Sequence, residues 1–593
     1  MAEEKLFVRK ATGLVREIGF LTAIIIVIAN TVGAGWQKRV FQYTGLAPLP
    51  ENQYLAGIPP MVMAFIIGGL VVLLSVLAVA VVTSAMPRSG GGYVAISRIL
   101  GPFWGFIGAW LEFLSIAWSF GLIAVIVFEG IYKNIGPIAF GVNIGAGLNE
   151  WFYFGAGLLL VLIFTVVGVF GVKLTGLLLQ VMFWIPAVLT FYVLGLVSQV
   201  STSSVTAGMT NLFGAGITPD KYVIAATDPT LGTTLQGQAA GIGGYWGAFG
   251  TALIGAYFAY IGYAASTFVA GEIKQANKNI PRSIVLATLL IIALYVGVSW
   301  ASSAALSGIA VHCVNGNTVT AGACSGNGLQ YSLLSAWSYL SFGGGTSLKD
   351  AGLPGVNLWT SAVSGVTASG IGLGSVNVLL VLFGVFWIAN DIPPFILTAS
   401  RIVFAMSFDR VLPAPFANVN DRFHSPVNAV IVTGVVAILG CISESKLFDA
   451  GGPLNGGSSL ALSTVLGSGG GVATTDLMDS LFFTFFTLSL VVLPLRASKR
   501  QIFDTAPYKP GGKWGMVALG LGGFAANLFV DYEFLIAPGG DYGLGTVNWS
   551  DISAISGLIF LIGIVVLGAA IYFAHRMKRG INYATIFAQI PPE

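Results

Sequence analysis

Long apolar stretches alternate with shorter polar segments along nearly all of the 593 residues of the chain. A helix needs about 20 apolar residues to cross a hydrocarbon layer about 30 Å thick, and stretches of that length occur twelve times. We expect membrane-spanning helices at residues 18–37, 58–85, 103–132, 151–170, 176–198, 246–271, 283–307, 374–403, 427–444, 477–496, 514–532 and 552–575. The pattern predicts an all-α integral membrane protein with twelve transmembrane helices.

The composition supports this fold class. Hydrophobic residues make up 55% of the chain and charged residues 9%, and the mean hydropathy is +0.86. A soluble domain has about 25% charged residues, so the composition excludes a soluble globular protein. The first apolar stretch follows a charged tail and lacks a small-residue cleavage site, which predicts a retained helix rather than a signal peptide.

The distribution of basic residues predicts how the chain is oriented. Lysine and arginine are enriched in cytoplasmic loops, and with the N-terminus inside, 21 of the 27 basic residues lie on that side. We expect a multi-pass protein of the plasma membrane with both tails, 1–16 and 576–593, in the cytoplasm. Lys38 and Arg39 are then two of the six basic residues in outer loops. No basic face interleaved with aromatic residues points to nucleic acid.

Two outer loops, 199–245 and 308–373, are long and rich in small polar residues. Loops of this length are usually functional or loosely ordered, and they offer a surface for an unknown partner. Cys313 and Cys324 lie together in the second loop, on the oxidising side of the membrane, so we expect them to form a disulfide. Closing so short a ring stabilises a fold by roughly 2–3 kcal/mol.

Glycine interrupts two apolar stretches at matching places in the two halves of the chain. A broken helix frees backbone N–H and C=O groups that lipid cannot bind, so breaks survive where they line a cavity or are buried in protein, and transporters hold substrate at such breaks. Close packing between helices is the alternative reason for glycine here. The candidate binding residues are Asn30, Val32, Gly33, Ala34, Gly35, Phe258, Ala259, Tyr260, Ile261 and Gly262.

Several motifs occur in the order found in one family of transporters. They are residues 86–93 with 101–106, residues 258–263 running into 272–274 and 279–282, Ser400-Arg401 with Asp409, Leu412 and Pro413, and residues 507–512. Together they resemble the amino acid–polyamine–organocation (APC) transporters from residue 16 to residue 575. Each motif alone is weak, whereas the ordered set is specific.

The resemblance implies an inverted repeat like that of the sodium-coupled leucine transporters. Helices one to five (17–198) would be repeated upside down as helices six to ten (246–496), with two further helices at 497–575. The two breaks would then face each other. The helix start after Gly35 suits a substrate carboxylate, and carbonyls around Tyr260 and Ile261 suit its ammonium. In the family an aromatic gate covers the substrate, and Phe258 matches it, although core packing is an alternative role.

Two departures from the family pattern leave the coupling ion open. Many relatives carry an acid where this chain has Ala264, and many carry a lysine near Pro186. Glu112 and Asp391 each lie about ten residues from the cytoplasmic end of a predicted helix, which is about 15 Å deep. A charged side chain there costs about 2.5–3.5 kcal/mol, so we expect both acids to be candidates for ion coupling.

Each acid also has a structural alternative. Residues 390–394 are typical of a helix break in which Asp391 caps a restarted helix that begins with proline. Glu112 could be a protonated carboxyl group bonded to a neighbouring helix. For Asp391, a sodium ion held together with carbonyls of the first helix is as consistent as a proton.

Catalytic and metal-binding motifs are missing from the sequence. The three histidines have no ligand-like spacing, and phosphate-binding and hydrolase motifs do not occur. We therefore predict no enzyme activity, no cofactor and no metal, and a proton- or sodium-coupled amino acid transporter working by alternating access. The alternatives are a polyamine or other cationic substrate, an exchanger, and a sensor or accessory subunit that does not transport.

Overall fold

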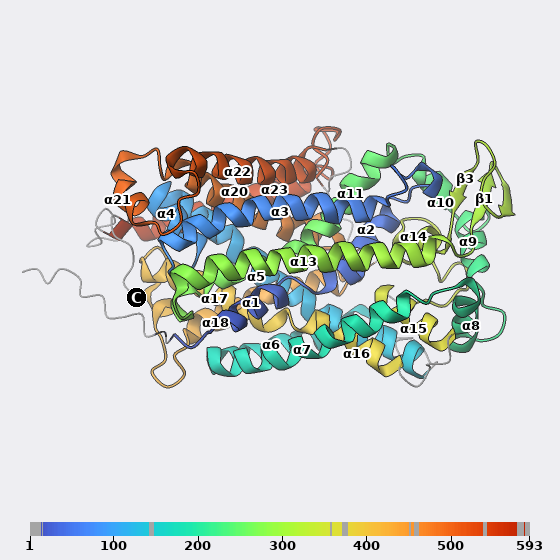
Figure 1. Ribbon diagram of the computed structural model, residues 1–593, viewed down its shortest axis with the longest axis horizontal. Helices are drawn as coiled ribbons and strands as arrows, with labels where there is room; N and C mark the ends of the chain where they lie inside the picture. Colours follow the sequence, from blue (N-terminus) through green and yellow to red (C-terminus); the bar gives the residue numbers. More distant parts are fainter. Residues whose placement is uncertain are drawn as a thin grey trace, which may run out of the picture.

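The computed structural model describes residues 14, 16–140, 148–355, 359–370, 377–449, 452–455, 462–537, 542–577 and 586–587. Long helices run side by side along the longest axis of the molecule (Figure 1). A small β-sheet with several short helices lies at one end, and α4 and α21 lie at the other.

Ten helical segments among the described residues are long and apolar enough to cross a membrane. They are α3 (Pro60–Ala85), α5 (Pro102–Gly130), α6 (Glu150–Val169), α7 (Val172–Val197), α13 (Ala276–Ser307), the pair α16 (Asn377–Ala389) and α17 (Ile392–Phe408), α18 (Val427–Glu444), α20 (Ser468–Val492), α22 (Gly512–Leu535) and α23 (Ser556–Arg576). Each overlaps one of the predicted spans. The chain is therefore a multi-pass membrane protein.

The other two predicted spans, the first and the sixth, are broken in the middle. The first consists of α1 (Phe20–Ala29), a non-helical stretch, the π-helix η1 (Gly35–Arg39) and α2 (Val40–Leu46). The sixth consists of α11 (Gly244–Tyr260), a turn, α12 (Ala265–Phe268) and the 3-10 helix η4 (Ala270–Glu272). Neither contains a helix of spanning length, because both are interrupted at the glycines.

The expected end of the first span at residue 37 is wrong. Helical structure continues to Leu46, so Lys38 and Arg39 do not lie in an open loop. Both side chains are buried, because they form ion pairs with Glu129 and Glu444.

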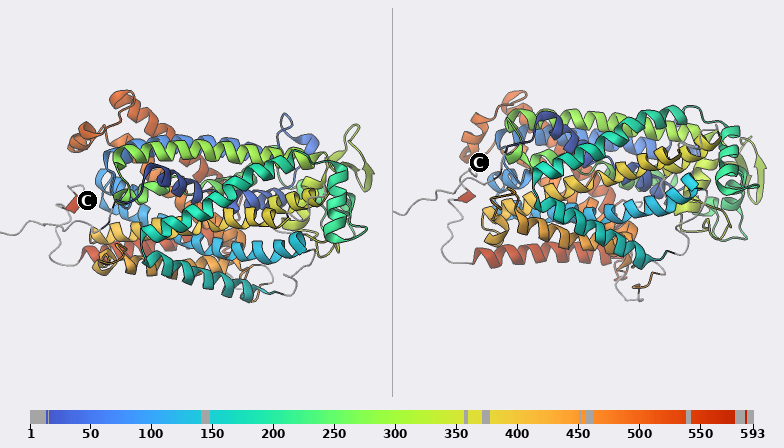
Figure 2. Two further views of the ribbon diagram at one scale, coloured as in Figure 1. Left: turned by 60° about the horizontal axis from the view of Figure 1, so that its bottom comes forward. Right: turned by 90° about the horizontal axis from the view of Figure 1, so that it is seen from below.

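The helices differ in how deeply they are buried. In the apolar window of α5, 94% of the residues are buried, against 22% in α6 and 28% in α7. A helix that is apolar all round must face either protein or lipid, so α5 belongs to the protein core, whereas α6 and α7 offer a face to lipid. Phe191 of α7, for example, is 79% exposed. The two views of Figure 2 show α6 and α7 along one side of the bundle.

The outer loops predicted at 199–245 and 308–373 hold regular structure. We call this group of elements the end cap; it comprises α8 (Thr202–Phe213), α9 (Pro219–Thr227), α10 (Leu235–Ala239), α14 (Leu333–Phe342), α15 (Trp359–Gly370), β1 (His312–Asn315), β2 (Thr318–Ala321) and β3 (Leu329–Tyr331). The strands form one antiparallel sheet in the order β2-β1-β3.

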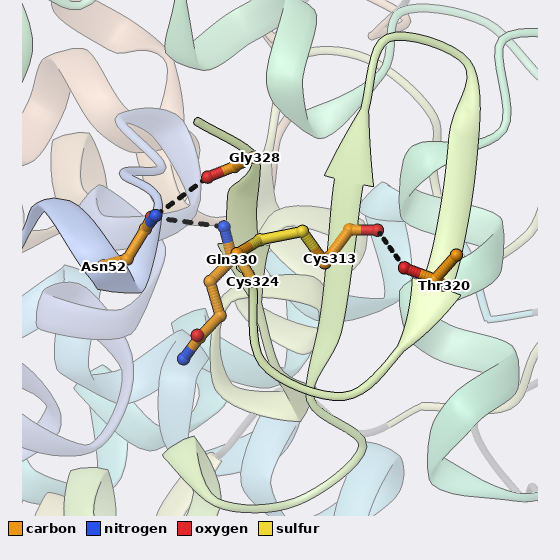
Figure 3. The surroundings of a disulfide bond; sticks show 6 residues. All are labelled: Asn52, Cys313, Thr320, Cys324, Gly328 and Gln330. Carbon is orange, nitrogen blue, oxygen red and sulfur yellow. Dashed lines mark hydrogen bonds between the residues drawn. A yellow bond between two sulfur atoms is a disulfide. The ribbon is translucent and has the colours of Figure 1, made fainter. Parts of the chain in front are cut away.

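A disulfide joins Cys313 and Cys324 beside this sheet (Figure 3). The short 3-10 helix η2 (Glu51–Gln53), just before α3, contacts the same region. Asn52 Nδ2 donates to Gly328 O (2.8 Å), and Gln330 N donates to Asn52 Oδ1 (3.2 Å). The end cap is thereby tied to the segment that follows the first broken helix.

The remaining short elements connect the long helices. They are α4 (Gly92–Ile99), η3 (Ile131–Phe140), η6 (Ala414–Ala417), α19 (Ser463–Leu466), η7 (Ala497–Lys499) and α21 (Arg500–Thr505).

Candidate functional site

The two helix breaks lie directly against each other. A methyl group on Gly35 would fall 2.3 Å from Ala259 Cα, which is closer than real carbon atoms approach. Gly262 has a φ of +99°, and a methyl group there would fall 2.1 Å from Asn30 Nδ2. Only glycine adopts that φ freely and leaves that space. Glycine thus both breaks the helices and lets the breaks touch.

Tyr295 of α13 connects the two breaks. Its hydroxyl group lies within hydrogen-bond distance of Thr31 O in the first break and of Ala259 O (2.7 Å) at the second. A tyrosine hydroxyl carries one proton, so it donates to one carbonyl at a time. Tyr295 is fully buried. Tyr295 was not predicted from the sequence, because a tyrosine in an apolar helix carries no distinguishing signal.

The breaks leave backbone groups without hydrogen bonds. Within the described residues, the N–H groups of Gly33 and Ala34 have no acceptor, and the carbonyls of Tyr260 and Ile261 have no donor. Buried backbone groups are nearly always paired. The first break therefore presents donors and the second presents acceptors.

A small cavity lies between the breaks. Its lining residues are Asn30, Thr31, Gly35, Ser119, Ile123, Phe258, Ile261, Asp391 and Phe395. Its volume of about 10 Å³ is roughly the space that one water molecule needs. An amino acid can therefore enter only if the surrounding helices or side chains move.

The predicted binding residues fall into two groups. Asn30, Gly35, Phe258 and Ile261 line the cavity. The rest shape the breaks without lining it, namely Val32, Gly33, Ala34, Ala259, Tyr260 and Gly262. Four lining residues were not predicted, namely Thr31, Ser119 and Ile123 of α5, and Phe395 of α17.

Buried polar atoms around the cavity have no partner among the residues that the structure describes. They are both side-chain polar atoms of Asn30, Ser119 Oγ and Asp391 Oδ1. These residues are at most 4% exposed. Because buried polar atoms are usually hydrogen-bonded, this set marks a site that suits a polar ligand.

Asp391 occupies the N-cap position of α17 but does not cap it. Its φ and ψ of −66° and −28° are helical, and its side chain makes no capping bond. An N-cap residue needs extended dihedrals to reach the next N–H groups, so the capping alternative is wrong. The carboxylate instead faces Gly33, where a methyl group would fall 1.8 Å from Asp391 Oδ2.

Glu112 lies outside the cavity, in a second buried polar cluster. Its carboxyl group is within hydrogen-bond reach of Asp479 on α20, and Tyr257 Oη donates to Asp479 Oδ2 (3.2 Å). A hydrogen bond between two carboxyl groups requires one of them to be protonated. The contact agrees with the alternative in which Glu112 bonds to a neighbouring helix, and it links Glu112 to the break through Tyr257, the neighbour of Phe258.

Buried ion pairs close the end of the site nearer the end cap. The outer charge network consists of Lys38, Arg39, Glu129, Lys133 and Glu444. Lys38 Nζ lies 2.8 Å from Glu444 Oε1 and also contacts Glu129, while Arg39 pairs with Glu444. The Arg39 guanidinium lies 5.6 Å from the ring centroid of Phe258. The network therefore joins the first broken helix to α5, to α18 and to the predicted gate.

A second set of ion pairs lies at the opposite end. The inner charge network consists of Arg98, Glu272, Arg401 and Asp409. Arg401 Nη2 lies 2.7 Å from Glu272 Oε1, and Arg98 Nη2 donates to Asp409 Oδ1 (2.9 Å). Next to it, Ile18 N donates to Glu272 O (2.9 Å), which ties the start of the first broken helix to the end of the sixth. Ion pairs thus cover the cavity at both ends.

Comparison with known proteins gives the chain a family. A family model described as amino acid permease matches residues 18–549. A serine/threonine exchanger of Bacillus subtilis is 25% identical over 293 residues, which cover 49% of this chain and 55% of that relative. An uncharacterized transporter of Mycobacterium tuberculosis is 26% identical over 433 residues, covering 73% of this chain and 75% of the relative.

Another relative is a cationic amino acid transporter of Arabidopsis thaliana, which is 26% identical over 183 residues covering 31% of this chain and 22% of that protein. The resemblance to APC transporters seen in the motifs is thereby confirmed. The chain belongs to the amino acid permease family, whose members are transporters and not enzymes.

Proposed function

We propose that this protein moves α-amino acids across the plasma membrane by alternating access, with both termini in the cytoplasm. The observation that carries the proposal is the pair of touching helix breaks, which present unpaired N–H groups on one side and unpaired carbonyls on the other. The two charged groups of an α-amino acid require that combination. Buried backbone groups at a break used only for packing are expected to find partners within the protein.

We infer the orientation of the substrate from the unpaired N–H groups of the first break and the unpaired carbonyls of the second. The N–H groups of Gly33 and Ala34, at the start of the helical segment from Gly35, suit a carboxylate because a helix N-terminus carries partial positive charge. The carbonyls of Tyr260 and Ile261 suit an ammonium group. Asp391 lines the same cavity on the side of Gly33, so a proton or a cation on Asp391 would keep two negative charges from meeting there. Phe258 covers the site from the side of Arg39.

Transport requires the two ends to open in turn. We infer twelve spans, with an inverted repeat of residues 17–198 and 246–496 and two added helices at 497–575. The broken helices would rock against α5, α17 and α18, releasing first one charge network and then the other. The small cavity supports this inference, because substrate has no room without such movement.

Asp391 is our first candidate for the coupling site. It lines the cavity beside Gly33, so a proton or a sodium ion there would contact the substrate pocket directly. Glu112 is the second candidate, and it would act through Asp479 and Tyr257. A coupling site at Asp391 predicts that the coupling ion and the substrate share one pocket.

Three other functions can be tested against amino acid transport coupled to an ion. The relative in Bacillus subtilis is a serine/threonine exchanger, so exchange without an ion is a second candidate. Asp391 in the cavity would also suit a polyamine or another cationic substrate. A sensor or accessory subunit of the same fold would bind an amino acid and not release it across the membrane.

Uptake by purified protein in liposomes tests these possibilities. A panel of labelled amino acids and a polyamine is offered under proton and sodium gradients imposed separately, and with unlabelled amino acid inside. We expect an amino acid to accumulate under one of the gradients. Uptake that ignores both gradients but needs internal amino acid would replace coupling by exchange, and binding without uptake would favour a sensor.

The variant Asp391→Asn separates coupling from folding. Losing a hydrogen bond to a charged group costs about 1.5–3 kcal/mol, so we expect gradient-driven uptake to fall roughly 10- to 100-fold. Asp228→Asn, on the exposed surface of the end cap, is the matched control and should transport normally. Unchanged coupling in Asp391→Asn would move the ion site to Glu112.

A further inference from the structure

An apolar groove opens on the lipid-facing side of the bundle, at the end that carries α4 and α21. We call it the inner groove. It lies between the start of α1, the second half of α3, the first half of α13 and the segment before α22, and its volume is about 970 Å³. Ligand pockets span about 300–1,000 Å³, so the groove has room for a large molecule. It is separate from the small cavity between the helix breaks.

Apolar side chains form the wall of the groove. Phe20, Leu286 and Leu289 line it, and they are 38%, 43% and 48% exposed. Val81 of α3 and Leu519 of α22 complete the apolar surface. Because these helices face the bilayer, a hydrocarbon chain is the natural occupant.

Two basic side chains stand at the groove. Arg282 is exposed and makes no hydrogen bond or ion pair with any residue that the structure describes. Lys509 lies in the same lining, and its Nζ donates to Asp504 O (2.6 Å). An ammonium group has three donors, so two remain. The groove thus combines a hydrocarbon-lined wall with donors suited to a phosphate.

We propose that the inner groove binds an anionic phospholipid. One acyl chain lies along Val81, Leu286 and Leu289, and the headgroup phosphate contacts Arg282 and Lys509. The proposal rests on the orientation given with the proposed function, in which this end is cytoplasmic. The cytoplasmic leaflet is where anionic lipids attract basic residues. The bound lipid would also contact Phe20, the first residue of α1.

Native mass spectrometry of the purified full-length protein tests the proposal. Delipidated protein is mixed with phosphatidylglycerol or with phosphatidylcholine of the same acyl chains, and the bound fraction is measured at each lipid concentration. We expect phosphatidylglycerol to bind more tightly. Arg282→Gln and Lys509→Gln should each weaken it about fivefold, the effect of one basic residue on an anionic lipid. Arg500→Gln, an exposed arginine outside the groove at the same end, should leave binding unchanged.

A second pair of variants tests the acyl-chain part. Leu289→Trp fills the groove, whereas Leu290→Trp adds the same bulk at a neighbouring exposed position that does not line it. We expect only Leu289→Trp to lower phosphatidylglycerol binding. Equal binding of the two lipids, an equal effect of Arg500→Gln and Arg282→Gln, or normal binding by Leu289→Trp would overturn the proposal. No substrate is present, so failure here leaves the transport proposal untouched.

Discussion

The outer and inner charge networks close the same cavity but differ in their balance of charge. The outer network sets three cations, Lys38, Arg39 and Lys133, against the two carboxylates of Glu129 and Glu444. The inner network pairs two arginines with two carboxylates, one to one. Removing one partner from a buried pair is strongly destabilising, because a charge is left without compensation. The outer network should therefore depend on its acids more than on its cations, and the inner network on both.

The networks also differ in what they hold. Lys38 and Arg39 belong to η1, the helical segment that begins at Gly35 in the cavity lining. Glu272 ends η4, beyond the break of the sixth predicted span. The outer network thus acts on the first broken helix and the inner network on the sixth. A change in either network should reach the cavity through a different break.

We expect the largest effect from Glu444→Gln. This change removes the carboxylate that pairs with both Lys38 and Arg39. Breaking a buried pair costs about 3–5 kcal/mol, and here one acid serves two cations. The thermal unfolding temperature of the purified protein should fall sharply. Glu150→Gln, a partly exposed glutamate at the start of α6, is the control; an equal fall in both would remove the special role of the network.

Glu272→Gln should have the next largest effect. It leaves Arg401 buried, with Ser400 Oγ (3.0 Å) as the remaining hydrogen-bond partner of its guanidinium group among the described residues. We expect a loss near the lower end of the same 3–5 kcal/mol range. A double-mutant cycle with Arg401→Gln checks the pairing, because the double variant should lose less than the two single losses added together. Additive losses would contradict a direct ion pair.

Glu51 adds a pH dependence to the outer end of the molecule. Its carboxyl group accepts from Ser332 Oγ and from Ser335 Oγ (3.2 Å) on the end cap. Burial raises the pKa of Glu51 from about 4.5 to about 7, although the two serine hydrogen bonds act to lower it.

The sign of this effect follows from the raised pKa. Between pH 4.5 and 7 the folded protein holds the proton more tightly than the unfolded chain does, so stability is greatest below pH 4.5 and is lost as pH rises through about 7. The loss is at most about 3 kcal/mol. Glu51→Gln should flatten the dependence of unfolding temperature on pH over this range. The same slope in both proteins would show that another group is responsible.

The smallest effect should come from Lys133→Gln. Lys133 pairs with Glu129, but its side chain is 26% exposed and Glu129 keeps Lys38 as a partner. Partly exposed ion pairs contribute about 0–1 kcal/mol, and the outer network already holds one more cation than acid. The unfolding temperature should change little. A loss as large as that of Glu444→Gln would contradict the charge count.

The predictions from sequence succeeded where a local pattern decides the structure. The length of the apolar stretches correctly predicted ten spans, and the positions of glycine predicted the interruptions after Ala29 and Tyr260. The environment of Lys38 and Arg39 was predicted wrongly, because Arg39 pairs with Glu444, 405 residues away in the chain. A count of basic residues predicts the side of the membrane but carries no information on a distant ion-pair partner.

The site was predicted only in part for a related reason. Ser119, Ile123 and Phe395 are ordinary residues of apolar helices, and they become lining residues only when the helices pack. Counting residues predicts a depth for Glu112 but carries no information on the face of the helix on which it lies. Its carboxyl group faces Asp479 and not the cavity. Asp391 reaches the cavity because its helix approaches Gly33 closely.

The most direct test of the central claim is the reactivity of a cysteine introduced in the cavity. Ser119→Cys places a thiol in the lining, while the natural Cys441 is buried and serves as the background in the unmodified protein. Protein in liposomes is treated with a charged thiol reagent from either side, with and without a transported amino acid. We predict labelling from both sides that the amino acid slows and that then blocks uptake. Labelling that no amino acid slows, or labelled protein that transports at the original rate, would contradict a substrate site between the breaks.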